Sequence, residues 1–264
     1  MVDVLGLGDA GIDIITKIPK IPAHDEKILA NDFSYHTGGV IANFLCALAK
    51  LGTKCGFVGL LGNDEFGERI IRKFTSLGID LSNLIIRQEE STYFCVSMLD
   101  QSGEKALVIF PTNTIFPQPD DIKQDMISGA KLLHTTGLHA ATAIKAFNFA
   151  KKESILASLD LEPSTLAQGQ NLGRQLISHT DILFLNTHAS KLLYPDIEDS
   201  EIVGKRLLAL GPKIVVLTLG ERGSTTVTRD QVIRIPAFHV NVVDTTGAGD
   251  CFNAAFIHTF LKES

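Results

Sequence analysis

The sequence lacks the features that mark several classes of protein. Its 264 residues contain no apolar run of 18 residues, so no segment is predicted to span a membrane. The 24 lysines and arginines are outnumbered by 30 aspartates and glutamates, and they form no basic stripe that could release counterions from nucleic acid. The N-terminus has no basic stretch of the kind that begins a signal peptide. We therefore expect a cytoplasmic protein that binds neither a membrane nor nucleic acid.

Cysteine is also scarce. The four cysteines show no C-x-x-C spacing, and the eight histidines show no H-E-x-x-H spacing. Free thiols in a reducing compartment are expected, and a histidine metal site is not. A chain of this length, with 45% hydrophobic residues, can bury a sizeable core without disulfides or a structural metal.

Short apolar runs alternate with amphipathic patterns along most of the chain. The runs are predicted to be buried parallel strands, over residues 2–8, 55–61, 131–135, 155–160, 182–185 and 214–219. The amphipathic patterns predict helices near 40–51, 64–77, 120–128, 141–152, 170–178, 200–210 and 248–261. Left-handed glycines are expected after three of these helices, at Gly52, Gly78 and Gly211. The alternation predicts a doubly wound, mostly parallel α/β sandwich, in one domain over residues 1–264.

Two segments interrupt this alternation. Residues 12–37 contain Pro19 and Pro22 and show no helical period, and residues 92–110 have the pattern of a β-hairpin across 101–103. Neither segment fits a strand–helix repeat. We expect both to form a small β-sheet that lies as a lid over one end of the main sheet.

A glycine motif follows the first predicted strand. Gly6, Gly8 and Gly11 match the G-x-G-x-x-G pattern of dinucleotide-binding turns, which requires a helix to open at the third glycine. The following residues, 12–19, are β-branched, alternating and stopped by proline, so they predict a strand. The motif is therefore interpreted as a sharp turn, and Asp13 as an acidic side chain near the strand end where ligands bind in open α/β sheets.

The segment with the strongest chemical signal is Asp-Thr-Thr-Gly-Ala-Gly-Asp at 244–250. Small residues at 247–249 allow a ligand to approach the backbone, and the helix that begins there presents unpaired N–H groups to an anion. Asp250 at the mouth of such a site has two interpretations. It is either a general base for an attacking hydroxyl group or an ordinary first-turn residue that stabilises the helix dipole.

This segment resembles the signature of the ribokinase family of carbohydrate kinases. A second match is Gly-Gly-Val-Ile-Ala-Asn at 38–43, and the segments at 61–67 and 218–223, with Asp9 and Asp13, fall in the order typical of that family. The resemblance covers essentially the whole chain. It implies a doubly wound fold with a small β-lid, a homodimer paired through the lid, and transfer of the ATP γ-phosphate to a hydroxyl of a small sugar with Mg²⁺.

The resemblance also implies roles for individual residues. Asp250 is similar to the family's general base, and the backbone amides of Gly247, Ala248 and Gly249 to its anion hole. Predicted contacts to the sugar are Asp13, Gly39 and Asn43. Predicted contacts on the ATP side are Asn186, Thr218, Gly220 and Gly223. Predicted members of a monovalent-cation site, for K⁺, are Asp244 and Thr246.

Three departures from the family pattern affect these expectations. Ala189 stands where the family has the glutamate of an Asn-x-x-Glu motif that organises magnesium, and we hypothesise that Glu162 replaces it. Val40 and Ile41 stand where ribokinases have Lys-Gly, so ribose is a less expected substrate, and a phosphosugar would require basic residues such as Lys27 or Arg87. Family members also continue beyond the position of Ser264, so the adenine pocket is expected to be incomplete or built differently.

Two alternatives remain open from the sequence. The first is a nucleoside kinase of the same family. The second is a catalytically impaired relative that binds a sugar or nucleotide and has a regulatory role, which Ala189 and the short C-terminus favour. Asp250 argues against the second alternative, because a protein that only binds does not need a base beside an anion hole.

Overall fold

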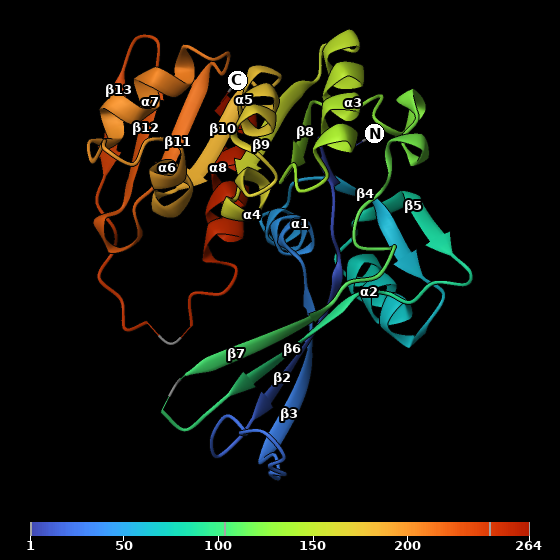
Figure 1. Cartoon of the computed structure of the whole chain (residues 1–264). Coiled ribbons are helices and arrows are strands. Elements are labelled where there is room, and N and C mark those ends of the chain that lie inside the picture. Colours follow the sequence, from blue (N-terminus) through green and yellow to red (C-terminus); the bar gives the residue numbers. More distant parts are fainter. Residues whose placement is uncertain (1, 103, 243, 264) are drawn as a thin grey trace.

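A large nine-stranded sheet forms the centre of the molecule. The structure is a computed structural model, and it describes residues 2–102, 104–242 and 244–263. The strand order is β13-β12-β11-β10-β9-β8-β1-β4-β5, and the pairs from β11 to β5 are parallel (Figure 1). The strands are β1 (Val4–Leu7), β4 (Cys55–Gly62), β5 (Asp80–Arg87), β8 (Leu132–Thr135), β9 (Leu156–Leu161), β10 (Ile182–Asn186), β11 (Ile214–Thr218), β12 (Ser224–Thr228) and β13 (Val232–Ile235).

Helices cover both faces of this sheet, which explains its apolar strands. All residues of β1 and β4 are buried, as expected for parallel strands between two helical layers. The helices are α1 (Val40–Lys50), α2 (Glu65–Ser76), α3 (Ala140–Lys152), α4 (Pro163–Leu166), α5 (Gln170–Ser178), α6 (Thr187–Leu193), α7 (Ser200–Leu208) and α8 (Ala248–Glu263). One core lies beneath α1, α2 and α8, and a second lies beneath α3 to α7. The predicted doubly wound fold is confirmed.

The predicted helix over 120–128 is wrong. The chain forms two short 3₁₀ turns instead, η1 (Pro119–Asp121) and η2 (Gln124–Met126), because Ile122 and Lys123 between them are extended. Ile122 and Ile127 are nevertheless buried. Their apolar spacing imitates a helical period, although an irregular segment places both side chains in the core.

The glycines after three helices differ in conformation. Gly52 (φ 88°) and Gly78 (φ 72°) have positive φ, as the sequence predicts for helix ends. Gly211 (φ 144°) departs from the left-handed helical region. A Cβ atom at Gly211 would lie 3.1 Å from the backbone of Ser178, so close packing between two chain segments accounts for this glycine.

The predicted small sheet is confirmed. It has four strands in the order β3-β2-β6-β7, and it projects from one end of the main sheet (Figure 1). The strands are β2 (Gly11–Lys17), β3 (Asp32–Gly38), β6 (Phe94–Leu99) and β7 (Lys105–Phe110). The residue at 103, within the predicted hairpin turn, lies outside the described residues. Strand β2 begins at the third glycine of the G-x-G-x-x-G motif, so no helix opens there and the interpretation as a turn is supported.

Aromatic contacts join this lid sheet to α2. The ring of Phe66 on α2 lies 6.1 Å from the ring of Tyr35 and 5.4 Å from the ring of Phe94. Phe94 in turn stacks on Phe110 at 4.4 Å. The base of the lid is thus fixed to the main domain by ring packing.

Within the described ranges, no helix is both long and apolar enough to cross a bilayer.

Substitution of Phe44 measures how much the core beneath α1 contributes to the stability of the fold. Its ring is completely buried and stacks on His134 at a centroid distance of 4.0 Å, while burial lowers the pKa of His134 to about 3 and keeps its imidazole neutral. We expect Phe44→Ala to lower the free energy of unfolding by about 3–5 kcal/mol in urea denaturation, because it leaves a cavity. The exposed residue Ile202 on α7 is the control, and Ile202→Ala should cost far less. Equal losses in the two variants would contradict this account of the core.

Candidate active site

The predicted functional residues gather at one edge of the main sheet. Because β1, β8, β9 and β10 are parallel, their carboxyl ends meet there. The same edge receives the N-terminal ends of α1 and α8, and the lid lies over it (Figure 1). Side chains from segments more than 200 residues apart are thereby brought into contact.

Asp9 organises the start of α1. Its buried carboxylate accepts hydrogen bonds from the amides of Val40 (3.0 Å) and Ile41 (3.2 Å) and from the hydroxyl of Tyr93 (2.9 Å). Burial raises the pKa of Asp9, and these three hydrogen bonds oppose the rise. Gly39 precedes the helix at φ 99°, and a Cβ atom there would lie 2.9 Å from the Tyr93 hydroxyl. Glycine is therefore required where the chain enters α1.

Asp13 lies on the lid strand β2 and faces the same region. A Cβ atom at Gly38 would lie 2.2 Å from Asp13 Oδ2, so the missing side chain makes room for this carboxylate. Burial raises the pKa of Asp13, and the positive charges of Lys105 and His36 oppose the rise. Among the predicted sugar contacts, Asp13 and Asn43 line one cavity of about 390 Å³, together with Gly247. Gly39 lies outside its lining and contributes the turn into α1.

Asp250 is held in place by an amide from α1. Asn43 Nδ2 donates a hydrogen bond to Asp250 Oδ2 at 2.9 Å, and the Asp250 side chain is only 9% exposed. Burial raises the pKa of Asp250 to about 6, against the opposing effect of the Asn43 hydrogen bond. The carboxylate is thus poised to exchange a proton near neutral pH, a property of a general base that an exposed first-turn aspartate does not have.

The three amides predicted as an anion hole are not equivalent. Gly247 has φ 75°, and α8 begins immediately after it. The amide of Ala248 donates to the carbonyl of Thr245 at 3.1 Å, so it is already engaged within the turn. A Cβ atom at Gly249 would contact nothing within 4 Å, which shows that the space beside it is open. An anion at this helix start would therefore compete with the Thr245 carbonyl for the amide of Ala248.

Two further carboxylates lie at the end of β9. Burial, with the charges of Glu162 and Asp250, raises the pKa of Asp160 to about 8. Burial, with the charges of Asp9 and Asp250, raises the pKa of Glu162 to about 7. Asn253, one turn after Asp250 on α8, donates from Nδ2 to Asp160 Oδ2 at 2.8 Å. Four acids thus share one region in which their mutual repulsion favours a bound cation.

The donor set at this edge is suited to Mg²⁺. Magnesium prefers oxygen ligands, and it often binds through one or two carboxylates while waters and substrate phosphates complete its shell. In the described part of the chain, no group of three or more His, Cys, Asp or Glu residues is arranged to hold a metal alone. Asp160 and Glu162 therefore fit a magnesium ion that arrives with a phosphate ligand, and they do not fit an all-protein cage.

A second cavity, of about 570 Å³, opens on the other side of the α8 N-terminus. The predicted ATP-side residues line it together with part of the predicted anion hole: Asn186, Thr218, Gly220, Gly223, Ala248 and Gly249. The sequence analysis missed its apolar wall, which includes Phe238 and Phe252. These rings carry no local motif, because Phe238 follows β13 and Phe252 lies on α8, and only the folded chain brings them to one cavity.

The Asn-x-x-Ala segment has a structural explanation. Asn186 Oδ1 accepts a hydrogen bond from the amide of Ala189 at 2.8 Å, which caps the N-terminus of α6. Ala189 is completely buried in the core beneath α3 to α7. At the position where the family has a glutamate, this chain therefore has a small side chain that packs in the core.

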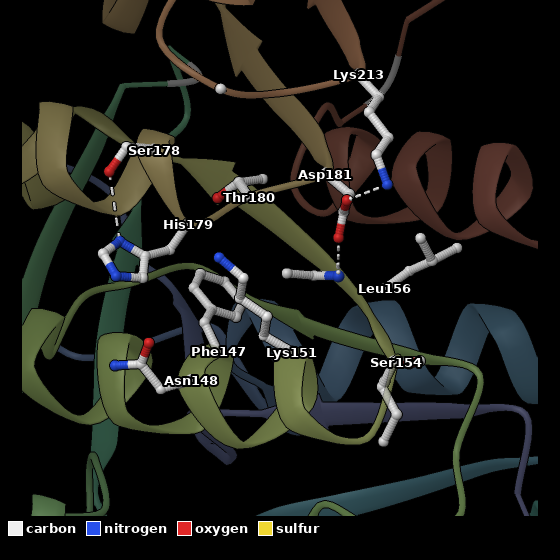
Figure 2. A pocket seen from close by; sticks show the side chains of 13 residues that line it. Phe147, Asn148, Lys151, Ser154, Leu156, Ser178, His179, Thr180, Asp181 and Lys213 are labelled. Carbon is white, nitrogen blue, oxygen red and sulfur yellow. Dashed lines mark hydrogen bonds and ion pairs between the residues drawn. The ribbon is translucent and has the colours of Figure 1, made fainter.

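Another cavity, of about 540 Å³, lies at the opposite edge of the sheet, between the C-terminal ends of α3 and α5. Figure 2 shows Lys213 paired with Asp181 there, at 2.8 Å. Asp181 also accepts a hydrogen bond from the amide of Ala157 at 2.9 Å. None of the predicted site residues lines this cavity, and its lysines lie near helix C-termini, where positive charge is stabilising. We assign it no function.

Comparisons with known proteins show the family to which the chain belongs. The whole chain, residues 1–264, matches the model of the pfkB family of carbohydrate kinases. It is 27% identical over 260 residues to a bifunctional ribokinase/ribose-5-phosphate isomerase A of Fructilactobacillus sanfranciscensis, with 96% of this chain and 47% of that protein covered. It is also 27% identical over 267 residues to a deoxyribokinase of Salmonella typhi, with 98% and 86% covered.

Solved structures show the same fold. The structure of Arabidopsis thaliana ribokinase in complex with ribose and ATP superposes with a TM-score of 0.83 and 25% identity, and 99% of this chain and 86% of that chain are covered. The fold and the family model define a ribokinase-like kinase. The chain belongs to the PfkB family of carbohydrate kinases.

The acidic region makes a testable contribution to stability. Asp160 binds its proton more tightly in the folded state (pKa about 8) than in the unfolded state (ordinary value 3.8), so it destabilises the fold as the pH rises from about 4 to about 8. Asp160→Asn removes this ionisation. We expect the variant to gain stability relative to the wild type by about 1 kcal/mol or more between pH 5 and pH 8, measured by urea denaturation in EDTA. A stability difference independent of pH would contradict the assignment.

Proposed function

We propose that the protein transfers the γ-phosphoryl group of ATP to a hydroxyl group of a small carbohydrate. The observation that carries this proposal is the position of the α8 N-terminus between two cavities. Asp13, Asn43 and Gly247 line one cavity, and Ala248 and Gly249 line the other. An acceptor and a nucleotide bound on the two sides would meet at the helix start, beside Asp250.

Asp250 would act as the general base. Its pKa of about 6 leaves it ionised at neutral pH, and the hydrogen bond from Asn43 fixes the orientation of its carboxylate. Asp13 and Asn43 would bind hydroxyl groups of the acceptor, since a carboxylate and an amide make directional hydrogen bonds to vicinal hydroxyls. Asp250 would then accept the proton of the attacking hydroxyl as the oxygen–phosphorus bond forms.

The start of α8 would stabilise the charge on the transferring phosphoryl group. Preorganised amides and a helix dipole are effective where negative charge develops and water is excluded. Magnesium bound with ATP would neutralise charge on the phosphates, and we propose that Glu162, next to Asp160, orients its ligand shell. Asp244 and Thr246 would bind a monovalent cation such as K⁺ beside the loop.

The apolar wall of the second cavity supports a site for the nucleotide base. Phe238 is 90% exposed, and Phe252 is half-buried nearby on α8. Aromatic faces suit a planar base, because stacking on a side chain contributes about 1–3 kcal/mol per base. The adenine of ATP would then be held by Phe238 and Phe252, and its phosphates would extend toward Gly249.

The lid supports a homodimer. The large apolar side chains on its strands β3 and β7 are exposed: Phe33, Tyr35, Leu107, Val108, Ile109 and Phe110. Exposed apolar patches of this kind mark interaction sites. We propose that the lid sheets of two copies of this chain pack against each other.

Two alternatives to a sugar kinase remain: a nucleoside kinase of the same family and a catalytically impaired regulatory protein. A panel of free sugars and nucleosides distinguishes a sugar kinase from a nucleoside kinase of the same family. Ala189 and its burial in the core favour a catalytically impaired regulatory protein. The contact between Asn43 and Asp250 argues against it, because a binding protein has no need for an oriented base. Turnover with none of the acceptors would exclude both kinase assignments.

Asp250→Asn tests the base directly. We expect it to lower kcat by about 10²–10⁴-fold in a coupled assay of ADP formation, because the hydroxyl proton loses its acceptor. In the wild type, kcat/KM should rise about fivefold from pH 5 to pH 6, reach about ten times its pH 5 value near pH 7 and level off above that, as Asp250 ionises. Asp230→Asn, in an exposed turn, is the matched control. Wild-type activity in Asp250→Asn would remove Asp250 from the mechanism.

Glu162→Gln tests the magnesium hypothesis. The variant keeps the size of the side chain and removes its charge, so the Mg²⁺ concentration at half-maximal rate should rise about 10–100-fold. Glu198→Gln is the control, since Glu198 pairs with Lys191 on the surface. If the magnesium dependence of turnover is the same in both variants, Glu162 does not organise the metal.

A further inference from the structure

A lysine of the lid reaches the loop that leads into α8. Lys105 is the first residue of β7, and its Nζ lies 3.5 Å from Thr246 Oγ1. Figure 1 shows the β6–β7 hairpin extending toward this loop from the lid. Thr246 directly precedes Gly247, and both line the first cavity. The lid therefore contacts the anion-binding start of α8 through a positive charge.

The register of the lid places Lys105 on the face that bears Asp13. Lys105 pairs with Leu99 of β6, and Leu99 pairs with Lys17 of β2. Side chains alternate along a strand, so Asp13, four residues before Lys17, shares that face. Burial raises the pKa of Asp13, and the charge of Lys105 opposes the rise. Hydrogen bonds from Thr246 lower the pKa of Asp244, and the charge of Lys105 adds a smaller contribution. The ammonium group thus lies beside Thr246, a loop residue that lines the first cavity, and its charge reaches Asp13.

The surrounding charges show why a cation is needed here. Asp9, Asp160, Glu162 and Asp250 lie close enough for their charges to raise one another's pKa values. A phosphate group that enters this edge meets repulsion from those of the four that are ionised. The two basic residues singled out in the sequence are placed differently: Arg87 ends the outermost strand β5 and pairs with Asp121, and Lys27 lies in the loop between β2 and β3.

We propose that Lys105 is a catalytic residue that contacts the transferring phosphoryl group when the lid closes. This inference rests on the proposed function. In the reaction, the bond between the γ-phosphorus and the bridging oxygen breaks, the acceptor oxygen bonds to that phosphorus, and the hydroxyl proton passes to Asp250, with ADP as the leaving group. Lys105 exchanges no proton in this step, and its ammonium group neutralises charge on the phosphoryl oxygens.

This arrangement links lid closure to catalysis. Lys105 belongs to the lid, while Gly247 and Gly249 belong to the main domain, so the positive charge is in place only when the two approach. The closed lid also excludes water, which otherwise competes with the acceptor for the phosphoryl group. An open lid would then leave bound ATP without part of its charge stabilisation.

The experiment compares Lys105→Gln, Lys105→Arg and Lys17→Gln with the wild type. Lys17 is the matched control, because it lies at the same level of the lid sheet, two strands away. We expect Lys105→Gln to lower kcat about 10–100-fold and to change the KM of the acceptor less than threefold, while Lys105→Arg keeps most of the activity and Lys17→Gln all of it. A lysine that merely holds the lid would instead raise the KM of the acceptor and spare kcat, and that result would overturn the proposal.

A second measurement separates this inference from the proposed function. If the wild type turns over none of the sugars or nucleosides, the proposed function fails, and thermal shift with inorganic phosphate then decides the role of Lys105. A ligand that binds only the folded state raises the melting temperature. Phosphate should raise it clearly in the wild type and in Lys17→Gln, and by less than half as much in Lys105→Gln. Equal responses in all three proteins, including no response, would overturn the proposal.

Discussion

The buried carboxylate of Asp9 is the interaction on which the rest of the site depends. Asp9 follows β1. Its carboxylate accepts hydrogen bonds from two backbone amides at the start of α1 and from the hydroxyl of Tyr93 at the base of the lid. Three parts of the fold thus meet at one charged group, whose lost hydration is replaced by three hydrogen bonds. Because α1 begins at this point, Asn43 is carried to the position from which it orients Asp250.

The second constraint is electrostatic. The fold gathers several carboxylates at one sheet edge, and burial raises their pKa values, so the site has a strong preference for positive charge. A nucleotide with magnesium would satisfy that preference, and the helix start between the two cavities would receive its terminal phosphate. These acids repel one another and occupy positions that apolar residues could fill, so they lower the stability of the fold at the place where chemistry is proposed to occur.

Much of the fold was predictable because parallel strands between two helical layers must be apolar throughout. Strand β5 was missed because it is a half-buried edge strand with polar residues such as Asp80 and Ser82. The site was predictable where one short segment carries the signal, as at 244–250. It was not predictable where a role arises from long-range contact. Nothing local marks Asp9 as the partner of α1, or Lys105 as the partner of Thr246, 141 residues away.

The central claim is that the start of α8 is a junction where a phosphoryl group passes from a nucleotide to an acceptor hydroxyl. The most direct measurement is the fate of the label when the protein is incubated with Mg²⁺, ATP labelled at its γ-phosphate, and a panel of sugars and nucleosides. The account predicts that the label appears in a phosphorylated acceptor and that ADP forms only when this acceptor is present. Label found only in inorganic phosphate, or ADP formed at the same rate without any acceptor, would contradict it.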